Sequence, residues 1–328
     1  MALLAAACDD DGGSSSSTAT SPAGSPTAAA TAAPERTLAE QIGVRGDLPA
    51  NDPIDLAARY GRTQGHAAAS KPFAGEPNVG DARPFFVQRI SGAAFSGKVP
   101  PDNVTITATL LAKSEHAYFY VDDALEVDQS SAQEAADDFE ASVWPAVTGV
   151  FGTPASPGVD GDPRIIILQA DLGGAVGGYF SPDDGFLRSV RPLSNEAEMV
   201  YMDRTLRLGG SAFSVVLAHE LQHLIHANVD ANEEAWINEG ISEASSGLVG
   251  GALSSVSAFA GQPDIQLNAW GSEDSSAHYG AGAAFARYLA HRFGGDQQLG
   301  AIIRQQGDGA QGIDEFLASV APELKFRD

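Results

Sequence analysis

The sequence predicts an α+β fold in which a small mixed sheet precedes a mainly helical half, with a disordered tether in front of both. Three observations predict it. Segments rich in β-branched and aromatic residues, with period-two alternation, occur between residues 84 and 203. From residue 211 onwards, apolar residues recur mainly at helical spacing. The first 36 residues are a low-complexity run rich in Ser, Ala, Thr and Pro.

These shifts in composition divide the 328 residues into four parts. Hydrophobic residues make up 43% of the chain, which is ample for a sizeable core. We expect residues 1–36 to be a signal-like segment and tether, and residues 37–80 to be a linker or pro-segment-like lead-in. The main region then has a β-rich first part, 81–210, and a helical second part, 211–328.

The amino-terminal segment MALLAAACDDD contains a short apolar stretch that ends at Cys8 and is followed by acidic residues. It resembles the end of a bacterial lipoprotein signal, which implies that Cys8 is lipidated and that the following run tethers the chain outside the cytoplasm. It departs from that pattern in lacking a basic segment, in the short apolar stretch and in Ala5, where leucine is usual. A mis-assigned start codon would explain the first two departures. The alternatives are secretion without an anchor, or a tail with an incidental cysteine.

The net charge limits the classes of molecule that the chain is expected to bind. The chain has 43 acidic and 19 basic residues, a net charge of -24, which disfavours binding to nucleic acids and to anionic lipid surfaces. No segment after Cys8 approaches the ~20 apolar residues that span a bilayer, so we expect membrane association only through Cys8. A single cysteine excludes an internal disulfide framework.

The β-rich part is expected to hold several strands over 84–90 and 103–123, then a helix over 129–151 that Pro145 interrupts. The apolar run 164–170 predicts a buried strand. Residues 198–203 predict a further strand, which we place at an edge of the sheet. The glycines of 173–178 lack the spacing of a phosphate-binding loop and indicate a flexible loop.

The helical part begins with a long helix over 211–229, followed by shorter ones separated by Gly, Pro and Asp. We expect these at 233–249, 277–294, 296–306 and 312–320.

The long helix contains the sequence HELQH. His219 and His223 are four residues apart, so on a helix their side chains lie on one face and can bind one metal ion. Zinc suits neutral imidazole ligands and, in catalytic sites, takes three protein ligands and a water. Glu220, beside the first histidine, could then act as a general base. Chance occurrence of this short pattern on an exposed helix is the alternative, but the apolar flanks indicate a buried helix.

HELQH followed by NEGISE resembles the gluzincin metallopeptidases, which include thermolysin. The resemblance implies a zincin-like catalytic domain in which His219, His223 and Glu239 bind zinc and Glu220 is the general base. It also implies that Glu243 orients His219, with Asn238 as a structural neighbour.

The wider pattern resembles the hyicolysin-like bacterial metallopeptidases over roughly residues 84 to 320, in the segments 118–123, 149–154, 165–180 and 279–294. One departure is the interval between His223 and Glu239, which is shorter than in thermolysin. We therefore expect a tight connection between the two helices.

Other peptidase classes fit less well. A metzincin needs glycine at 226 and histidine at 229, whereas this chain has His226 and Val229. We expect His226 to lie on the surface or behind the ligands. The Gly-x-Met-Glu-Asn segment of the alanyl aminopeptidases is missing, which favours endopeptidase action.

Peptide hydrolysis also requires a donor to the developing oxyanion. We predict Tyr279 for this role, and His278 is the second candidate. The alternative is that Tyr279 only packs at the start of a helix. The strand at 198–203 could pair with an extended substrate. The acidic clusters 160–162 and 183–185 could bind Ca²⁺, although solvated loops are the better interpretation.

The sequence therefore predicts a zinc-dependent peptidase, an endopeptidase whose substrate is an extracellular protein or peptide. The competing hypothesis is a catalytically inactive surface or adhesion module that binds zinc for structure. Glu220 argues against it, since a purely structural site has no use for a base.

Overall fold

The computed structural model describes residues 53–60, 70–251, 254–270 and 275–327. The signal-like segment, Cys8 and the predicted tether lie outside these residues. The first described element, α2 (Pro53–Arg59), lies within the predicted lead-in. Among the described residues, no helix combines the length and apolar character that a membrane crossing requires.

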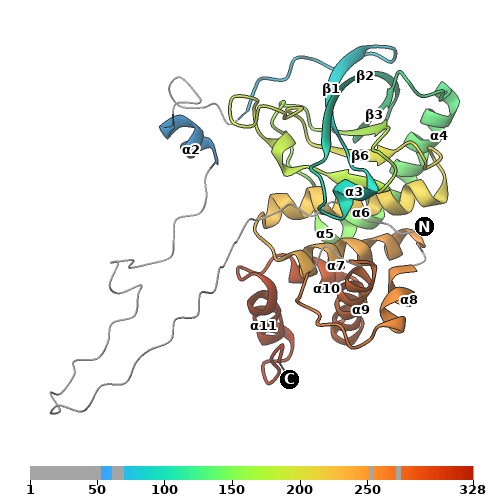
Figure 1. Ribbon diagram of the computed structural model, residues 1–328. Coiled ribbons are helices and arrows are strands. Elements are labelled where there is room, and N and C mark those ends of the chain that lie inside the picture. Colours follow the sequence, from blue (N-terminus) through green and yellow to red (C-terminus); the bar gives the residue numbers. More distant parts are fainter. Residues whose placement is uncertain (1–52, 61–69, 252–253, 271–274, 328) are drawn as a thin grey trace, which may run out of the picture.

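A six-stranded mixed sheet forms the upper part of the molecule (Figure 1), as predicted. In space the strands follow the order β1-β2-β3-β4-β6-β5. β3, β4 and β6 pair in parallel, and the other neighbours are antiparallel. The strands are β1 (Ala82–Arg89), β2 (Asp102–Lys113), β3 (Ala117–Asp122), β4 (Ile165–Ala170), β5 (Gly178–Phe180) and β6 (Met199–Asp203).

The prediction that residues 198–203 form an edge strand was wrong. β6 lies inside the sheet, parallel to β4 on one side and antiparallel to β5 on the other. All five residues of β6 are buried, as expected for a strand covered on both faces. The edge is instead β5, which follows the glycine-rich segment predicted as a loop.

The helical segment before β4 is divided near Pro145, as predicted. It consists of α4 (Gln129–Asp138), a π-helical turn (Phe139–Val143) and α5 (Trp144–Phe151). Pro145 lies in the first turn of α5, directly after the π-helical turn. A short helix that we did not predict, α3 (Gly92–Phe95), connects β1 to β2.

The long helix α6 (Ser211–Val229) lies between the sheet and the helical half (Figure 1). It contacts β5 and β6 on one side and α7 on the other. Eleven consecutive residues, Val216 to His226, are buried. A helix covered on both sides is expected to be apolar all round, and its ionisable residues are therefore exceptional.

The helical half packs below α6 (Figure 1). Its helices are α7 (Ala235–Ser246), a 3₁₀ turn (Gly247–Val249), α8 (Ser254–Gly261), α9 (Ser275–Phe293), α10 (Gln297–Ile302) and α11 (Gly309–Val320). Of these, only α8 was not predicted.

α7 and α9 cross at two glycines. A Cβ atom on Gly240 would lie 2.7 Å from the backbone carbonyl carbon of Gly282. Since no side chain separates the two backbones, α9 approaches α7 closely. This contact brings the start of α9 towards the residues of α7 that follow Trp236.

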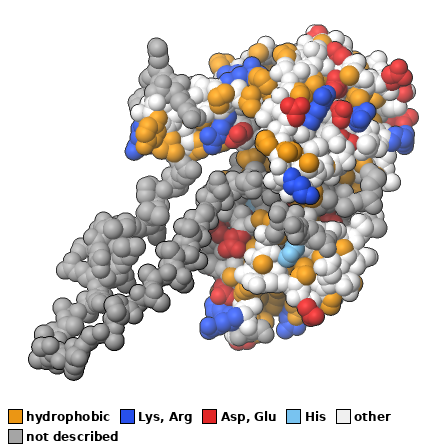
Figure 2. Space-filling model, viewed as in Figure 1, with side chains coloured by type: hydrophobic (Ala, Val, Ile, Leu, Met, Phe, Trp, Pro, Cys, Tyr) orange, Lys and Arg blue, Asp and Glu red, His pale blue; other side chains and the backbone are white. Residues whose placement is uncertain are grey.

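Two apolar cores flank the sheet. The larger joins the sheet to α4, α5, α6 and the helical half. The smaller covers the opposite sheet face and includes Phe85, Tyr120 and Tyr201. On the surface drawn in Figure 2, acidic and basic side chains are interspersed over the sheet-bearing part and do not form a single patch.

Candidate metal centre

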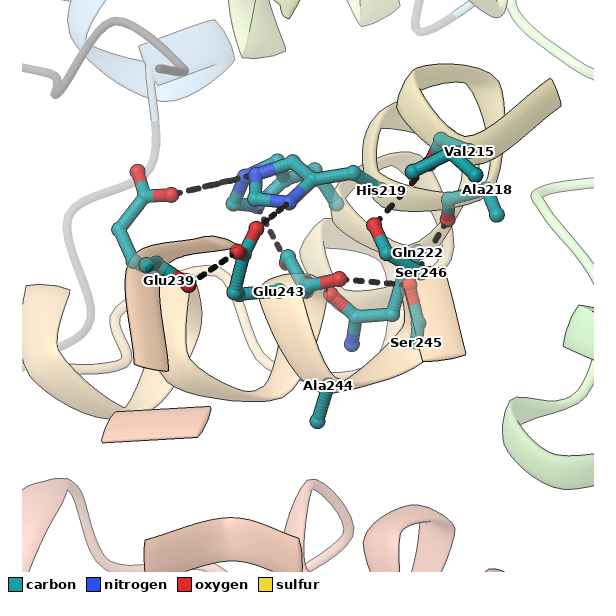
Figure 3. Close-up of polar contacts among 12 residues, drawn as sticks. Val215, Ala218, His219, Gln222, Glu239, Glu243, Ala244, Ser245 and Ser246 are labelled. Carbon is teal, nitrogen blue, oxygen red and sulfur yellow. Dashed lines mark hydrogen bonds and ion pairs between the residues drawn. The ribbon is translucent and has the colours of Figure 1, made fainter. Parts of the chain in front are cut away.

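Three predicted ligands meet at the contact between α6 and α7. The Nε2 atoms of His219 and His223 are 3.1 Å apart. Glu239 Oε2 lies 3.4 Å from His219 Nε2 and 3.2 Å from His223 Nε2. All three side chains are buried. Figure 3 shows Glu239 reaching from α7 towards the His219 ring.

This triangle fits a tetrahedral metal ion. Two ligands at about 2.0–2.1 Å from a zinc ion, and about 109° apart, are about 3.3–3.4 Å from each other. The three measured separations, 3.1 to 3.4 Å, are close to that edge. Moreover, Glu239 Oε2 is buried without a hydrogen-bond partner. Two imidazoles and one carboxylate oxygen therefore form a donor set suited to Zn²⁺.

The second nitrogen of each histidine faces a residue of α7. His223 Nδ1 donates to Asn238 Oδ1 over 2.7 Å, with Ser242 Oγ 3.0 Å away. Glu243 Oε2 lies 3.5 Å from His219 Nδ1, on the side of the ring away from Glu239. Such contacts fix the ring orientation and direct each Nε2 lone pair to the centre of the triangle. Asn238 and Glu243, which the family resemblance singled out, thus lie beside His223 and His219.

Serine hydroxyls join α7 to α6. Ser245 donates to the carbonyl of Ala218 and Ser246 to that of Val215, each over 3.0 Å (Figure 3). Ser242 donates to the Gln222 side chain. Only five residues, 230–234, connect the two helices. This bonding explains how so tight a connection still sets Glu239 opposite the two histidines. We did not predict a role for these serines, although their spacing in the sequence places them on one face of α7.

The charged groups at this centre shift the pKa values of His219 and Glu239 in opposite directions. Burial alone would lower the pKa of His219, but Glu239 and Glu243 outweigh it and raise that pKa to about 10. Burial would raise the pKa of Glu239, but His223 and His219 outweigh it and lower that pKa to about 2.

Glu220 lies on α6 next to the ligands and is 1% exposed. Burial raises the pKa of its carboxyl group, while the charges of His219 and His223 act in the opposite direction. The backbone of Phe180, in β5, also favours the charged form of Glu220. Its Oε2 has no hydrogen-bond partner. A buried, partly unpaired carboxylate beside a metal-binding triangle can exchange a proton with a bound molecule.

The structure brings Tyr279, but not His278, against the centre. Tyr279 lies in the first turns of α9, with its ring centroid 6.3 Å from that of His219. Burial raises the pKa of its hydroxyl well above the usual range, and the charges of Glu239, Glu220 and Glu243 add to this effect. The hydroxyl therefore stays protonated. His278 instead packs against Trp270, at 5.9 Å between ring centroids.

The expectation for His226 was partly wrong. It is not a surface residue: it is 1% exposed, because α6 is covered on both sides. Neither ring nitrogen has a hydrogen-bond partner. Burial lowers its pKa to about 3, with a smaller contribution from His223, so the imidazole is neutral.

The interpretation of both acidic clusters as solvated loops was also wrong in part. Asp162 is buried and accepts a hydrogen bond from the Tyr118 hydroxyl. Asp184 is buried as well and accepts from Tyr201 and from the backbone of Asn195. Neither cluster is among the His, Cys, Asp and Glu groups that converge within metal-binding distance in the described part of the chain.

Comparisons with known proteins show a distant likeness among solved structures. No protein-family model matches the sequence, and no curated protein matches it. Among solved structures, the chain is similar to native yeast LTA4 hydrolase, with a TM-score of 0.44 and 15% sequence identity. The match covers 74% of this chain and 42% of that chain, so this chain spans less than half of that protein's length. So distant a likeness carries no inference about activity, which has to come from the site itself.

Proposed function

We propose that this chain is a zinc-dependent peptidase of the gluzincin type, an endopeptidase acting on extracellular proteins. The observation that supports it most is the convergence of His219, His223 and Glu239 beside the buried carboxylate of Glu220. A structural zinc site would use four protein ligands and no base. Here three ligands and a base come together.

A bound Zn²⁺ would supply a water of lowered pKa and would polarise the scissile carbonyl group. Glu220 takes the proton of the attacking water and passes it to the nitrogen of the leaving amine. Burial suits this role because it raises the pKa of Glu220 and so favours the protonated form after transfer. Its unpartnered Oε2 is the atom available for the proton.

Tyr279 is the proposed donor to the oxyanion. Its ring lies beside His219, and its hydroxyl stays protonated and can donate to a developing negative charge at the same centre. Tyr279→Phe should lower kcat about 100-fold or more, with little change in KM. His278→Phe is the matched control, since His278 faces Trp270, and it should leave kcat nearly unchanged.

The substrate is proposed to lie along β5. This strand pairs only with β6 among the described residues, so its outer edge is available for strand addition. Phe180 of β5 also lines a cavity of about 220 Å³ with Leu224, which is one helical turn from Glu220. Most of the other lining side chains are apolar: Ala155, Pro182, Phe186, Ala197, Ala227 and Ala231.

This cavity favours an apolar side chain next to the cleaved bond. A peptide library should therefore be cut preferentially beside Leu, Phe or Met. Ala227→Phe, which fills part of the cavity, should shift the preference to smaller residues. An unchanged preference in this variant would show that the cavity does not bind the side chain next to the cleaved bond.

Endopeptidase action is distinguished from aminopeptidase action by blocked peptides. We expect equal cleavage of a peptide with free ends and of the same peptide acetylated and amidated at its ends. Cleavage that requires a free amino terminus would establish an exopeptidase instead.

The proposed location is the outer surface of a cell, with the chain anchored through lipidated Cys8. Metabolic labelling with a fatty acid should mark the wild-type chain and leave Cys8→Ser unlabelled. Equal labelling would rule out this anchor.

The function as a whole is tested by casein cleavage with the purified chain. We expect activity that a chelator abolishes and Zn²⁺ restores. Glu220→Gln should lower the rate about 10²–10⁴-fold while the protein keeps its metal. A folded, zinc-loaded wild-type chain that cleaves neither casein nor a peptide library would favour the inactive binding module.

A further inference from the structure

We propose that His226, Asp230 and Glu233 form a second binding site for a divalent transition-metal ion, at the carboxyl end of α6. One ligand atom from each residue lies within 4.8 Å of the other two. His226 ends the buried run of α6, and the two acids follow in the turn to α7. This inference is independent of the proposed peptidase activity.

The strongest observation is the state of His226. Its side chain is 1% exposed, and both ring nitrogens are buried without a hydrogen-bond partner. An imidazole buried in this way has lost its hydrogen bonds to water and gained none in return, which costs free energy. A metal ion bound to one nitrogen would compensate for that loss.

The two carboxylates are only partly satisfied. Asp230 Oδ1 accepts from the backbone of Asn232 over 3.1 Å. Glu233 Oε1 accepts from the backbone of Gly309 and of Glu234, over 2.7 and 2.6 Å. Among the described residues, no hydrogen bond reaches the other oxygen of either carboxylate. Each acid therefore has an oxygen left for a metal ion, while its first oxygen fixes its orientation.

The local charge also favours a cation. Two further carboxylates, Asp230 and Asp308, act on Glu233 as like charges. The carboxyl end of a helix adds a partial negative charge, and Asp230 caps α6 through its backbone bond to the His226 carbonyl. Like charges held together without a cation repel one another, so a divalent ion would stabilise this turn.

The donor set indicates the class of ion. Ca²⁺ and Mg²⁺ prefer sites made of oxygen ligands alone, whereas an imidazole with two carboxylates suits Zn²⁺ or Mn²⁺. Asp230 and Glu233 are both half-buried, so the site can be reached from solvent. An ion here would brace the five-residue turn that leads from the α6 histidines to Glu239 on α7.

The test isolates this site in the Glu239→Gln background, which weakens the first site. The purified full chain is stripped of metal and titrated with Zn²⁺, and bound metal is measured by elemental analysis after dialysis. We expect Glu239→Gln to retain one equivalent of Zn²⁺. Adding Glu233→Gln should remove that equivalent, whereas adding Glu234→Gln, the matched control one residue along, should not.

The Tm of the same variants gives a second measurement. Zn²⁺ should raise the Tm of Glu239→Gln and of its Glu234→Gln derivative, but not of its Glu233→Gln derivative. If folded Glu239→Gln binds no Zn²⁺ or Mn²⁺, or if the Glu233 and Glu234 variants bind equally, the second site is refuted. Binding of Ca²⁺ with no binding of Zn²⁺ or Mn²⁺ would refute the assigned class of ion.

Discussion

Two buried groups of polar side chains in this chain differ in how fully they are hydrogen-bonded. On the sheet face turned away from α6, both carboxylate oxygens of Asp184 accept hydrogen bonds, one from Tyr201 and one from Asn195. At the α6–α7 contact, the Oε2 atoms of Glu220, Glu239 and Glu243 all lack a hydrogen-bond partner. Burial is common to both groups, so burial alone does not mark a functional site. The two groups differ instead in how completely their carboxylate oxygens are paired.

The largest effect is expected from Glu239→Gln, which removes the charge of a ligand. The affinity of the centre for Zn²⁺ should fall by more than about 10³-fold, beyond the 10–100-fold typical of changes behind a ligand. A titration in metal buffers measures it. Asp184→Asn, an equally buried acid in the fully bonded group, is the control and should bind Zn²⁺ like the wild type. Equal loss in both variants would erase the distinction between the two groups.

Asp184 should affect stability rather than metal binding. Burial raises its pKa to about 7, despite the hydrogen bonds from Tyr201 and Asn195. Because the folded pKa is above the unfolded one, its contribution to stability is complete below about pH 4 and is lost as pH rises through 7. The wild type should lose up to about 4 kcal/mol from this residue between those limits.

Denaturant unfolding at pH 4, 5.5, 7 and 8 measures this loss. Asp184→Asn should flatten the pH profile, because the amide does not ionise. A profile as steep in the variant as in the wild type would show that Asp184 is not the titrating group.

The crossing of α7 and α9 gives a third, smaller effect. Gly240→Ala places a Cβ atom 2.7 Å from the Gly282 backbone and should destabilise the fold by about 1–3 kcal/mol. It should also move Tyr279 relative to Glu239, which would lower kcat. Gly149→Ala, at a glycine with no atom within 4 Å of the added Cβ, is the control. Greater stability in Gly240→Ala than in the wild type would contradict the tight crossing.

Glu243 belongs to the incompletely paired group but is not one of the three ligands, so its expected effect is smaller. Its Oε1 accepts from Ser255 over 2.5 Å, while its Oε2 faces His219 Nδ1. Glu243→Gln should weaken Zn²⁺ binding about 10–100-fold and leave the site occupied at high metal concentration. An effect as large as that of Glu239→Gln would mean that Glu243, and not Glu239, is the ligand.

Helical periodicity explains why the metal centre was predictable. His219, Glu220 and His223 belong to one helix, so their relative positions follow from spacing alone. Glu239 required the resemblance to a known family, because no local rule sets the angle between α6 and α7. The hydroxyls of Ser245 and Ser246 set that angle, and their partners are 27 and 31 residues away.

Other features could not be predicted because they depend on distant contacts. The apolar run at 198–203 predicts a strand but not its neighbours, and β5, only three residues long, takes the edge. The burial of Asp184 depends on Asn195, which also bonds Phe86, 109 residues away. The predicted surface position of His226 was wrong because the sequence of α6 does not show that other elements cover this helix on both sides.

The central claim is that His219, His223 and Glu239 bind one divalent ion. Crystals of the zinc-loaded chain, measured at the zinc absorption edge, test it directly. We predict an anomalous peak about 2.0–2.2 Å from both Nε2 atoms and from Glu239 Oε2. A zinc-saturated crystal with no peak between these three side chains, or with Glu239 turned away from it, would contradict the account.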